Sequence, residues 1–383
     1  MTTHAPGEGS RTAKTPSASR LAYIDNLRVL LTVLVVLHHA ALTYGNIPMW
    51  FYAEPANDAS GGLLDVFVGL NQTYFMGLFF MVSGIFVPGS VDRRGSKSFL
   101  RGRLVRLGVP LLLFLLLMRP IIAVSGYLDD AAGELPYWLY LLITWTPGPM
   151  WFVEALLVFS LAYVMIRSFR PPEHTLIAQR RTGRLPGPVA IAGFTLVLIA
   201  ATYLWRLLVP IGSYWPIVGL PTPDYLAQYA LLFTVGALAY RRGWFDAIPR
   251  AAGLGGLATV IAALVLLAPI AGTSFEEAMV RGSFASLVMS TFESVFAVGM
   301  ILFLLWLFQR FVNRQGHFGR FLSDNAYAVY FLHTLVLVAI GVALSGWDAP
   351  AVTKFAALAV LAVPTTWIGA ALIRAIPGAT RVF

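Results

Sequence analysis

The first long apolar segment carries an arginine and a histidine whose spacing places them on one helix face. Arg28 and His39 are eleven residues apart, so at 100° per residue they lie within about 20° of each other around a helix axis. An imidazole can take a proton from a hydroxyl near neutral pH, because its ordinary pKa is about 6.5. His39 is therefore a candidate general base, or alternatively a residue that accepts an acyl group covalently.

The neighbours of His39 on this segment have different interpretations. Asp25 lies about 40° from His39 on the same face, and its three-residue spacing from Arg28 predicts an ion pair that orients the arginine. At 1.5 Å per residue, His39 lies about 16 Å beyond Arg28, near the expected middle of a membrane. A packing histidine bonded to a neighbouring helix is the alternative for His39, and it is the favoured interpretation for His38.

A basic stretch between the second and third apolar segments could bind phosphate. Arg103 and Arg106 are three residues apart and so are neighbours on one helix face. Two guanidinium groups held in this way suit bidentate binding of a phosphate-bearing ligand. The alternative is that the stretch is basic for topological reasons alone, as loops on the cytoplasmic side usually are. The basic residues of this stretch are Arg93, Arg94, Lys97, Arg101, Arg103 and Arg106.

A later apolar segment offers a second histidine. Tyr327, Tyr330 and His333 recur every three residues, and His333 lies about 14 Å beyond Asp324. His333 is a candidate catalytic residue, with a packing role as the alternative. Tyr330, Ser83, His333 or a backbone N–H could stabilise a developing oxyanion.

Other ionisable residues fall inside apolar segments, where charges usually face a bundle interior. Glu154 lies near the predicted outer end of the fourth segment, where it is a candidate catalytic residue. Glu154 or Glu293 could orient a histidine. Arg119 and Arg206 are candidate counter-ions for these two carboxylates.

The composition indicates what kind of molecule positions these residues. Of the 383 residues, 58% are hydrophobic and 12% charged, and there is no cysteine. A soluble chain carries about 25% charged residues, so the composition predicts a polytopic membrane protein. Without cysteine, a thiol nucleophile and a thiolate-ligated metal are excluded, and we expect no metal. The net charge of +9 is explained by topology, so no nucleic-acid partner is predicted.

Ten apolar segments predict an all-α fold of about ten transmembrane helices. We expect a disordered basic cytoplasmic tail over residues 1–20, one transmembrane domain over residues 21–375, and a short cytoplasmic tail over residues 376–383. Residues 137–145 are too short to cross and are expected at the outer interface. The predicted spans are 27–45, 64–87, 107–128, 149–166, 187–208, 224–240, 251–271, 284–308, 325–345 and 352–373.

The basic residues predict the orientation of the chain. Of the 27 lysines and arginines, 22 fall in the two ends and in alternate loops, whereas the opposite loops hold Arg281 and Lys354 alone. This alternation follows the positive-inside rule and predicts that both termini are cytoplasmic. The opposite loops are acidic, with Glu54, Asp58 and Asp129 among their residues.

Five motifs along the chain resemble those of the acyltransferase family 3 membrane enzymes. The chain is most similar to the branch that contains the glucan-biosynthesis succinyltransferase. The motifs occur in the family order and cover nearly the whole chain. They are IDNLR at 24–28 with His39 eleven residues after its arginine, LFFMVSG at 78–84, SFLRGRLVRLGVP at 98–110, PMWFVEALLVFS at 149–160 and AYAVYFLH at 326–333.

The resemblance implies a function and assigns residues to it. The family moves acyl groups from a cytoplasmic acyl-CoA donor to hydroxyl groups of extracytoplasmic carbohydrates or related acceptors. Its first-helix arginine and histidine correspond to Arg28 and His39, and its Arg-x-x-Arg pair to Arg103 and Arg106. Gly102 departs from the family pattern, since many members carry another arginine there. No fused esterase-like domain is found in this sequence.

The residues and the resemblance together predict a membrane O-acyltransferase. Arg103 and Arg106, with Arg28 and Arg101, are expected to bind acyl-CoA at the cytosolic mouth, while His39 activates the acceptor hydroxyl. The partners are acyl-CoA, a carbohydrate or glycolipid acceptor and the lipid bilayer, in the cytoplasmic membrane of a bacterium. A proton-coupled transporter without acyl chemistry is the alternative, and a ligand-sensing membrane protein is a weaker one. The oligomeric state is not readable from the sequence.

Overall fold

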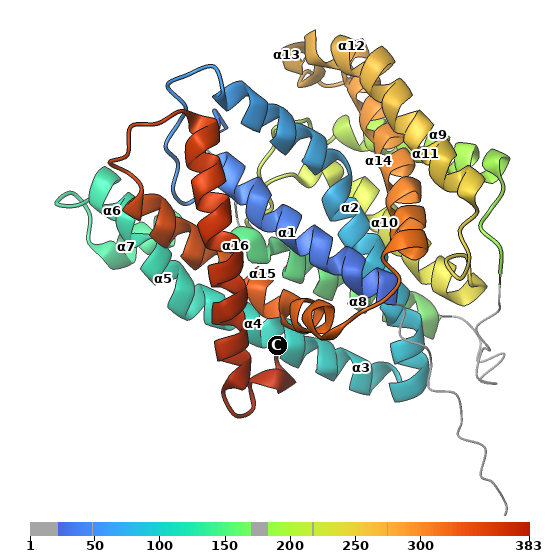
Figure 1. Ribbon diagram of the computed structural model, residues 1–383, viewed down its shortest axis with the longest axis horizontal. Helices are drawn as coiled ribbons and strands as arrows, with labels where there is room; N and C mark the ends of the chain where they lie inside the picture. Colours follow the sequence, from blue (N-terminus) through green and yellow to red (C-terminus); the bar gives the residue numbers. More distant parts are fainter. Residues whose placement is uncertain (1–21, 48, 170–182, 217, 274) are drawn as a thin grey trace, which may run out of the picture.

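The chain is a bundle of helices. The computed structural model describes residues 22–47, 49–169, 183–216, 218–273 and 275–383 (Figure 1). Over these ranges the chain forms helices and connecting loops, and its β-pairing is limited to one bridge between Trp215 and Leu220. The predicted tail at residues 1–20 lies outside the described residues.

Nine helical segments of the described residues are long and apolar enough to cross a membrane. The sixth predicted segment forms α10 (Leu226–Arg242), whose 17 residues span about 26 Å. The all-α polytopic membrane fold predicted from the sequence is therefore confirmed, with one segment shorter than the other nine. The nine segments are Ala22–Tyr44 (α1), Gly61–Arg94 (α2), Ser96–Asp129 (α3 to α6), Tyr137–Ser168 (α7 and α8), Pro188–Arg206 (α9), Arg250–Ile270 (α11 and the start of α12), Phe284–Phe311 (α14), His317–Ala343 (α15) and Ala351–Ala375 (α16).

Several helices continue past the apolar residues that predicted them. α1 begins at Ala22, so Asp25 and Arg28 lie inside the helix, and α2 continues through Arg94. Hydropathy falls where charged residues begin, but the helix continues because arginine has a high helix propensity. The sequence therefore located the spans correctly and underestimated their lengths at the arginine-rich ends.

The centre of the bundle is built by α1, α2, α10, α14, α15 and α16, which pack in pairs such as α1 with α15 and α2 with α10. α9 and α11, together with α12 (Ala268–Thr273) and α13 (Phe275–Ala278), gather beside α14 at one end of the molecule (Figure 1). Most residues of α9 and α11 are not covered by other parts of the protein. An apolar helix that is exposed in this way is suited to face lipid.

Two glycines allow the closest helix contact of the centre. A Cβ atom added at Gly84 of α2 would lie 2.2 Å from the backbone oxygen of Phe233, and one added at Gly236 of α10 would lie 1.9 Å from that of Met81. Neither position can hold a larger side chain without moving a backbone. Small residues at such crossings are typical of packed transmembrane helices.

The segment that carries the Arg-x-x-Arg pair is not a regular α-helix. α3 (Ser96–Arg103) passes into a π-helical turn at Leu104–Gly108, followed by α4 (Val109–Leu113), a second π-helical turn at Phe114–Met118, α5 (Arg119–Ile122) and α6 (Val124–Asp130). Residues 137–145 form α7 (Tyr137–Ile143), which is too short to cross, and α8 runs over Trp151–Ser168.

Candidate active site

His39 of α1 and His333 of α15 lie in contact, and we call them the histidine pair. Nδ1 of His39 is 3.1 Å from Nε2 of His333, and the two ring centroids are 5.0 Å apart. His333 is fully buried and His39 is half-buried. The sequence named both residues as candidates, but the 294 positions between them concealed that they meet.

The hydrogen bonds of the histidine pair define where its protons lie. Nδ1 of His333 is 2.6 Å from the carbonyl oxygen of Tyr330. A carbonyl oxygen accepts and never donates, so Nδ1 of His333 carries the hydrogen. In a neutral ring Nε2 of His333 is then an acceptor, and Nδ1–H of His39 donates to it. This leaves the lone pair of His39 on Nε2, the nitrogen that can act as a base.

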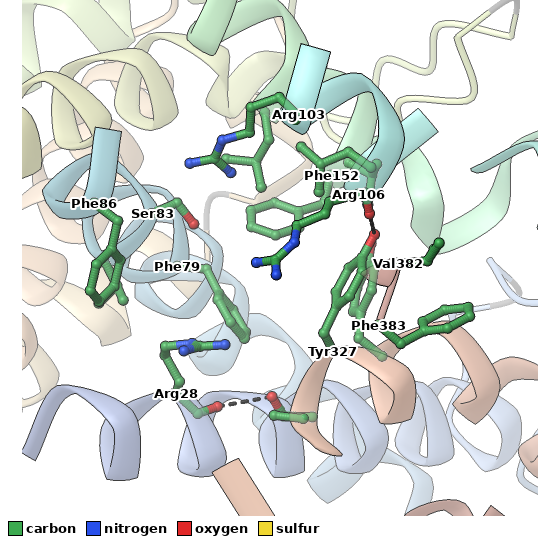
Figure 2. Close-up of a pocket in the computed structure, with 18 of the residues that line it drawn as sticks. Arg28, Phe79, Ser83, Phe86, Arg103, Arg106, Phe152, Tyr327, Val382 and Phe383 are labelled. Carbon is green, nitrogen blue, oxygen red and sulfur yellow. Dashed lines mark hydrogen bonds between the residues drawn. The ribbon is translucent and has the colours of Figure 1, made fainter. Parts of the chain in front are cut away.

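A cavity of about 530 Å³ opens beside the histidine pair. Five arginines from four different helical segments line it, together with one aspartate, so the lining carries a strong positive charge. Figure 2 shows Arg28 on one wall with Arg103 and Arg106 on the facing wall, all extending into the same space. We call this space the arginine cavity. Its charged lining residues are Arg28, Arg94, Arg103, Arg106, Arg374 and Asp324.

A hydrogen bond from a neighbouring helix holds the backbone at Arg106. Pro110 has no N–H, so it cannot make the bond that the N–H of residue 110 would donate to the carbonyl of Arg106 in a regular α-helix. The carbonyl oxygen of Arg106 accepts a hydrogen bond of 2.8 Å from the hydroxyl of Tyr327 on α15 (Figure 2). Arg103 extends over the ring of Phe99 at 5.3 Å. The π-helical turn and its Tyr327 contact therefore tie the Arg-x-x-Arg pair to the helix that carries His333.

The ion pair predicted between Asp25 and Arg28 is confirmed. Nη1 of Arg28 is 3.2 Å from Oδ1 of Asp25, which is almost fully buried. The hydroxyl of Thr32, one turn later, donates to the backbone oxygen of Arg28 at 2.9 Å. Asp25 therefore holds the arginine at the wall of the arginine cavity.

The inner end of the arginine cavity stops one side chain short of the histidine pair. Thr32, Phe152 and Tyr330 line this end, and His39 does not. The ring of Tyr330 lies 5.7 Å from that of His333, while its hydroxyl donates to the backbone oxygen of Pro149. Tyr330 therefore stands between the cavity and the two histidines.

Comparison with known proteins agrees with this geometry. The family model described as an acyltransferase domain, that of acyltransferase family 3, matches residues 21–373. The chain belongs to acyltransferase family 3. No curated protein and no solved structure matches the chain. The resemblance predicted from the five motifs is confirmed at the level of the family, while the succinyltransferase branch stays a prediction.

Two of the site residues predicted for this family 3 member lie outside the arginine cavity and do not contact the histidine pair. Arg101 is exposed on α3 and does not line the arginine cavity, because the helical turn directs it away from Arg103. Glu293 does not contact a histidine: its two carboxylate oxygens lie 2.7 Å from Nη2 of Arg206 and 2.6 Å from the hydroxyl of Tyr225. The predicted Arg206–Glu293 counter-ion pair is confirmed, but the orienting role for Glu293 is wrong.

Arg206 belongs to a second buried cluster of this family member. It is 1% exposed, and its Nη2 also lies 3.0 Å from Oδ2 of Asp224. The buried arginine gives each carboxylate a cation within hydrogen-bond distance, and loss of the arginine would leave two carboxylates buried together without one. The cluster ties α9 and α14 to the 3-10 turn at Pro223–Tyr225, which precedes α10, and it lines no part of the arginine cavity.

The catalytic role of Glu154 stays a prediction, whereas Arg119 has a different partner from the one predicted. Among the described residues, no hydrogen bond joins Glu154 to either histidine, although it lies on α8 just after cavity residues Phe152 and Val153. Arg119 is not its counter-ion, because Nη2 of Arg119 donates to the backbone oxygen of Thr144 at 2.5 Å. Ser83 does line the arginine cavity.

His38 has the packing role that the sequence favoured for it. Its ring stacks on Phe75 at 5.1 Å, and its Nδ1 is 3.3 Å from the amide nitrogen of Asn71. Successive residues of a helix point 100° apart, so His38 faces α2 while His39 faces α15.

Sequence reasoning missed Arg374 and Trp50 of the site, and it named Arg94 only as one member of the basic stretch. Arg94 and Arg374 line the arginine cavity, at the last turns of α2 and α16. Nη1 of Arg374 donates to Oδ1 of Asn325 at 3.3 Å. Trp50, in the loop after α1, stacks on His39 with ring centroids 3.9 Å apart. The arginines were counted as topological charges, and no spacing rule connects a loop tryptophan with a helix histidine.

Proposed function

We propose that the protein is a membrane O-acyltransferase that moves an acyl group, acetyl or succinyl, from cytoplasmic acyl-CoA to a hydroxyl of an extracytoplasmic carbohydrate or glycolipid. The membrane is the cytoplasmic membrane of a bacterium. The carrying observation is that Tyr330 both lines the arginine cavity and contacts His333, which bonds His39. The charged cavity and the candidate base therefore belong to one site.

The arginine cavity supports coenzyme A as the donor. Coenzyme A carries a pyrophosphate and a further phosphate, and guanidinium groups bind phosphate oxygens bidentately. Arg103, Arg106 and Arg28 extend from facing walls, and Arg94 and Arg374 add two further cations. Five arginines against one aspartate suit a ligand with several negative charges, which a neutral transported solute would not need.

The hydrogen bonds of the histidine pair support His39 as the general base. Its Nδ1–H donates to His333, so Nε2 has a lone pair for the acceptor hydroxyl. His333 acts through His39, by fixing this tautomer while its own Nδ1–H is held by the carbonyl of Tyr330. Ser83 lines the arginine cavity and is our candidate for binding the thioester oxygen.

The reaction then balances with these groups alone. Nε2 of His39 takes the proton of the acceptor hydroxyl as its oxygen forms a bond to the thioester carbon. The carbon–sulfur bond breaks, and the leaving thiolate receives the proton from His39, which gives free coenzyme A and an ester. In a covalent variant His39 first accepts the acyl group and then transfers it. The thioester must pass Tyr330 in either case, because that ring lies at the inner end of the arginine cavity.

Purified protein in liposomes tests this function. We expect labelled acetyl-CoA or succinyl-CoA to be consumed, with release of free coenzyme A and formation of a labelled ester on octyl β-D-glucopyranoside as the acceptor probe. A transporter would instead move solute across the liposome without forming an ester. Transfer of the label from acyl-CoA to the ester by wild-type protein, but not by a His39→Ala variant, assigns the chemistry to this site. Flux without ester formation would contradict the proposal.

A further inference from the structure

Trp50 stacks on His39 and does not line the arginine cavity. The indole and imidazole rings are nearly parallel, with an angle of 16° between their planes and 3.9 Å between their centroids. Trp50 lies in the loop that follows α1, six residues after the helix ends at Tyr44. If the donor reaches His39 from the arginine cavity, the acceptor needs a separate approach, and Trp50 contacts His39 without lining that cavity.

The indole N–H of Trp50 is a buried donor with no partner among the described residues. Buried polar groups are nearly always hydrogen-bonded, and a tryptophan N–H can only donate. The atom that satisfies it must be an acceptor such as a hydroxyl oxygen. A hydroxyl can accept from this N–H and at the same time donate its hydrogen to Nε2 of His39.

The loop is fixed on both sides of Trp50. Asn46 donates to the carboxylate of Asp65 on α2 through its backbone N–H at 2.8 Å and its side-chain amide at 2.7 Å. On the other side, Glu54 donates its backbone N–H to Thr43 at 2.7 Å and pairs with Lys354 of α16 at 2.5 Å. These anchors hold the loop against the bundle, while the indole itself makes no hydrogen bond that would have to break for a ligand to enter.

We propose that Trp50 is an acceptor-binding residue, whose indole N–H donates to the acceptor hydroxyl that His39 deprotonates and whose ring closes the outer side of the histidine pair. This rests on the proposed function. A flat aromatic face beside a free donor suits a saturated ring that carries hydroxyl groups, which is the chemistry of a carbohydrate. The acceptor ring takes a place against the indole, and the hydroxyl proton then passes to Nε2 of His39.

The closing role can be tested by cysteine labelling, which does not depend on catalysis. Because the chain has no cysteine, an introduced cysteine is the one thiol that can react. A single-cysteine variant, His39→Cys, is exposed in right-side-out membrane vesicles to a membrane-impermeant thiosulfonate reagent. We expect slow labelling with Trp50 present, slow labelling with Trp50→Phe, and labelling about tenfold faster with Trp50→Ala, since an aromatic ring stacked on residue 39 blocks the route. Ala59→Cys, at an exposed position of the same loop, should label equally in all three backgrounds. Equal labelling of His39→Cys with and without the indole would overturn the closing role.

The donor role of the N–H is tested by acyl transfer to octyl β-D-glucopyranoside. Trp50→Phe keeps an aromatic ring and removes the N–H, so we expect about a tenfold rise in KM for the glucoside with the KM for acyl-CoA unchanged. An unchanged KM for the glucoside would overturn this role. A wild-type protein that hydrolyses acyl-CoA through His39 but acylates no glucoside would overturn the carbohydrate assignment. If labelling depends on Trp50 but no acyl-CoA is consumed, the proposed function fails and the closing role stands.

Discussion

Nδ1 of His39 lies 3.1 Å from Nε2 of His333, whose own Nδ1 is bonded to the carbonyl of Tyr330. This chain of bonds begins at a group that can only accept, so the proton positions along it are determined. It leaves a lone pair on Nε2 of His39. Two histidines on different helices thus form one hydrogen-bonded unit, which suits the roles proposed for them, His39 as the base and His333 as the residue that orients it.

His39→Ala is expected to abolish acyl transfer while the protein still inserts and folds. The variant removes the group that is proposed to take the hydroxyl proton. Loss of a general base lowers the rate by about 10²- to 10⁴-fold. The measurement is labelled ester formation, with yield and melting temperature in detergent as the control for folding. Normal transfer by the variant would remove His39 from the mechanism.

His333→Gln is expected to lower kcat less than His39→Ala does. The amide can still accept from Nδ1–H of His39, but the imidazole contact and the buried bond to Tyr330 change together. We expect a loss of about tenfold to a hundredfold in kcat, with the KM for acyl-CoA little changed. Steady-state kinetics with varied acyl-CoA separate the two constants. A loss equal to that of His39→Ala would indicate that His333 itself transfers the proton.

Arg103→Ala, Arg106→Ala and Arg94→Ala should each raise the KM for acyl-CoA. Each removes charge-assisted hydrogen bonds to phosphate, which are worth about 1.5–3 kcal/mol, so the rise should be about tenfold or more. Arg93→Ala is the matched control, because Arg93 is exposed next to Arg94 and does not line the arginine cavity. Donor binding unchanged in all three variants would leave these arginines with a topological role alone.

Tyr327→Phe should weaken donor binding although its hydroxyl need not touch the donor. The substitution removes the hydrogen bond to the backbone oxygen of Arg106, to which Pro110 has no N–H to donate. The Arg-x-x-Arg pair then loses its fixed position against α15. We expect a rise of about fivefold in the KM for acyl-CoA with kcat nearly unchanged. A fall in kcat at constant KM would show instead that Tyr327 acts in the chemical step.

Gly236→Leu should destabilise the bundle by about 1–3 kcal/mol or more, because the new side chain overlaps the backbone of α2. Gly69→Leu is the matched control. Gly69 lies on α2, the helix that Gly236 of α10 contacts, and nothing lies within 4 Å of a Cβ atom added at Gly69. The measurement is the melting temperature of each variant in one detergent. Equal melting temperatures for the two variants would contradict the close packing of α2 against α10.

Local spacing in the sequence determined the fold class, the spans and several contacts. Hydropathy averages over about 20 residues, so it locates membrane helices without knowledge of their neighbours. The three-residue spacing of Asp25 and Arg28 was sufficient to predict their ion pair. The Arg-x-x-Arg pair was found for the same reason, since its residues are neighbours on one helical turn.

Only the tertiary structure decided which distant residues meet. In a bundle that is apolar on every face, hydropathy does not indicate which side of a helix packs inward. The contact of His39 with His333, the meeting of Arg94 and Arg374 in the arginine cavity, and the stacking of Trp50 all join segments far apart in the chain. The fold also decided between the two partners predicted for Glu293. A buried carboxylate pairs with a cation in contact with it, and the fold placed Arg206 rather than a histidine beside Glu293.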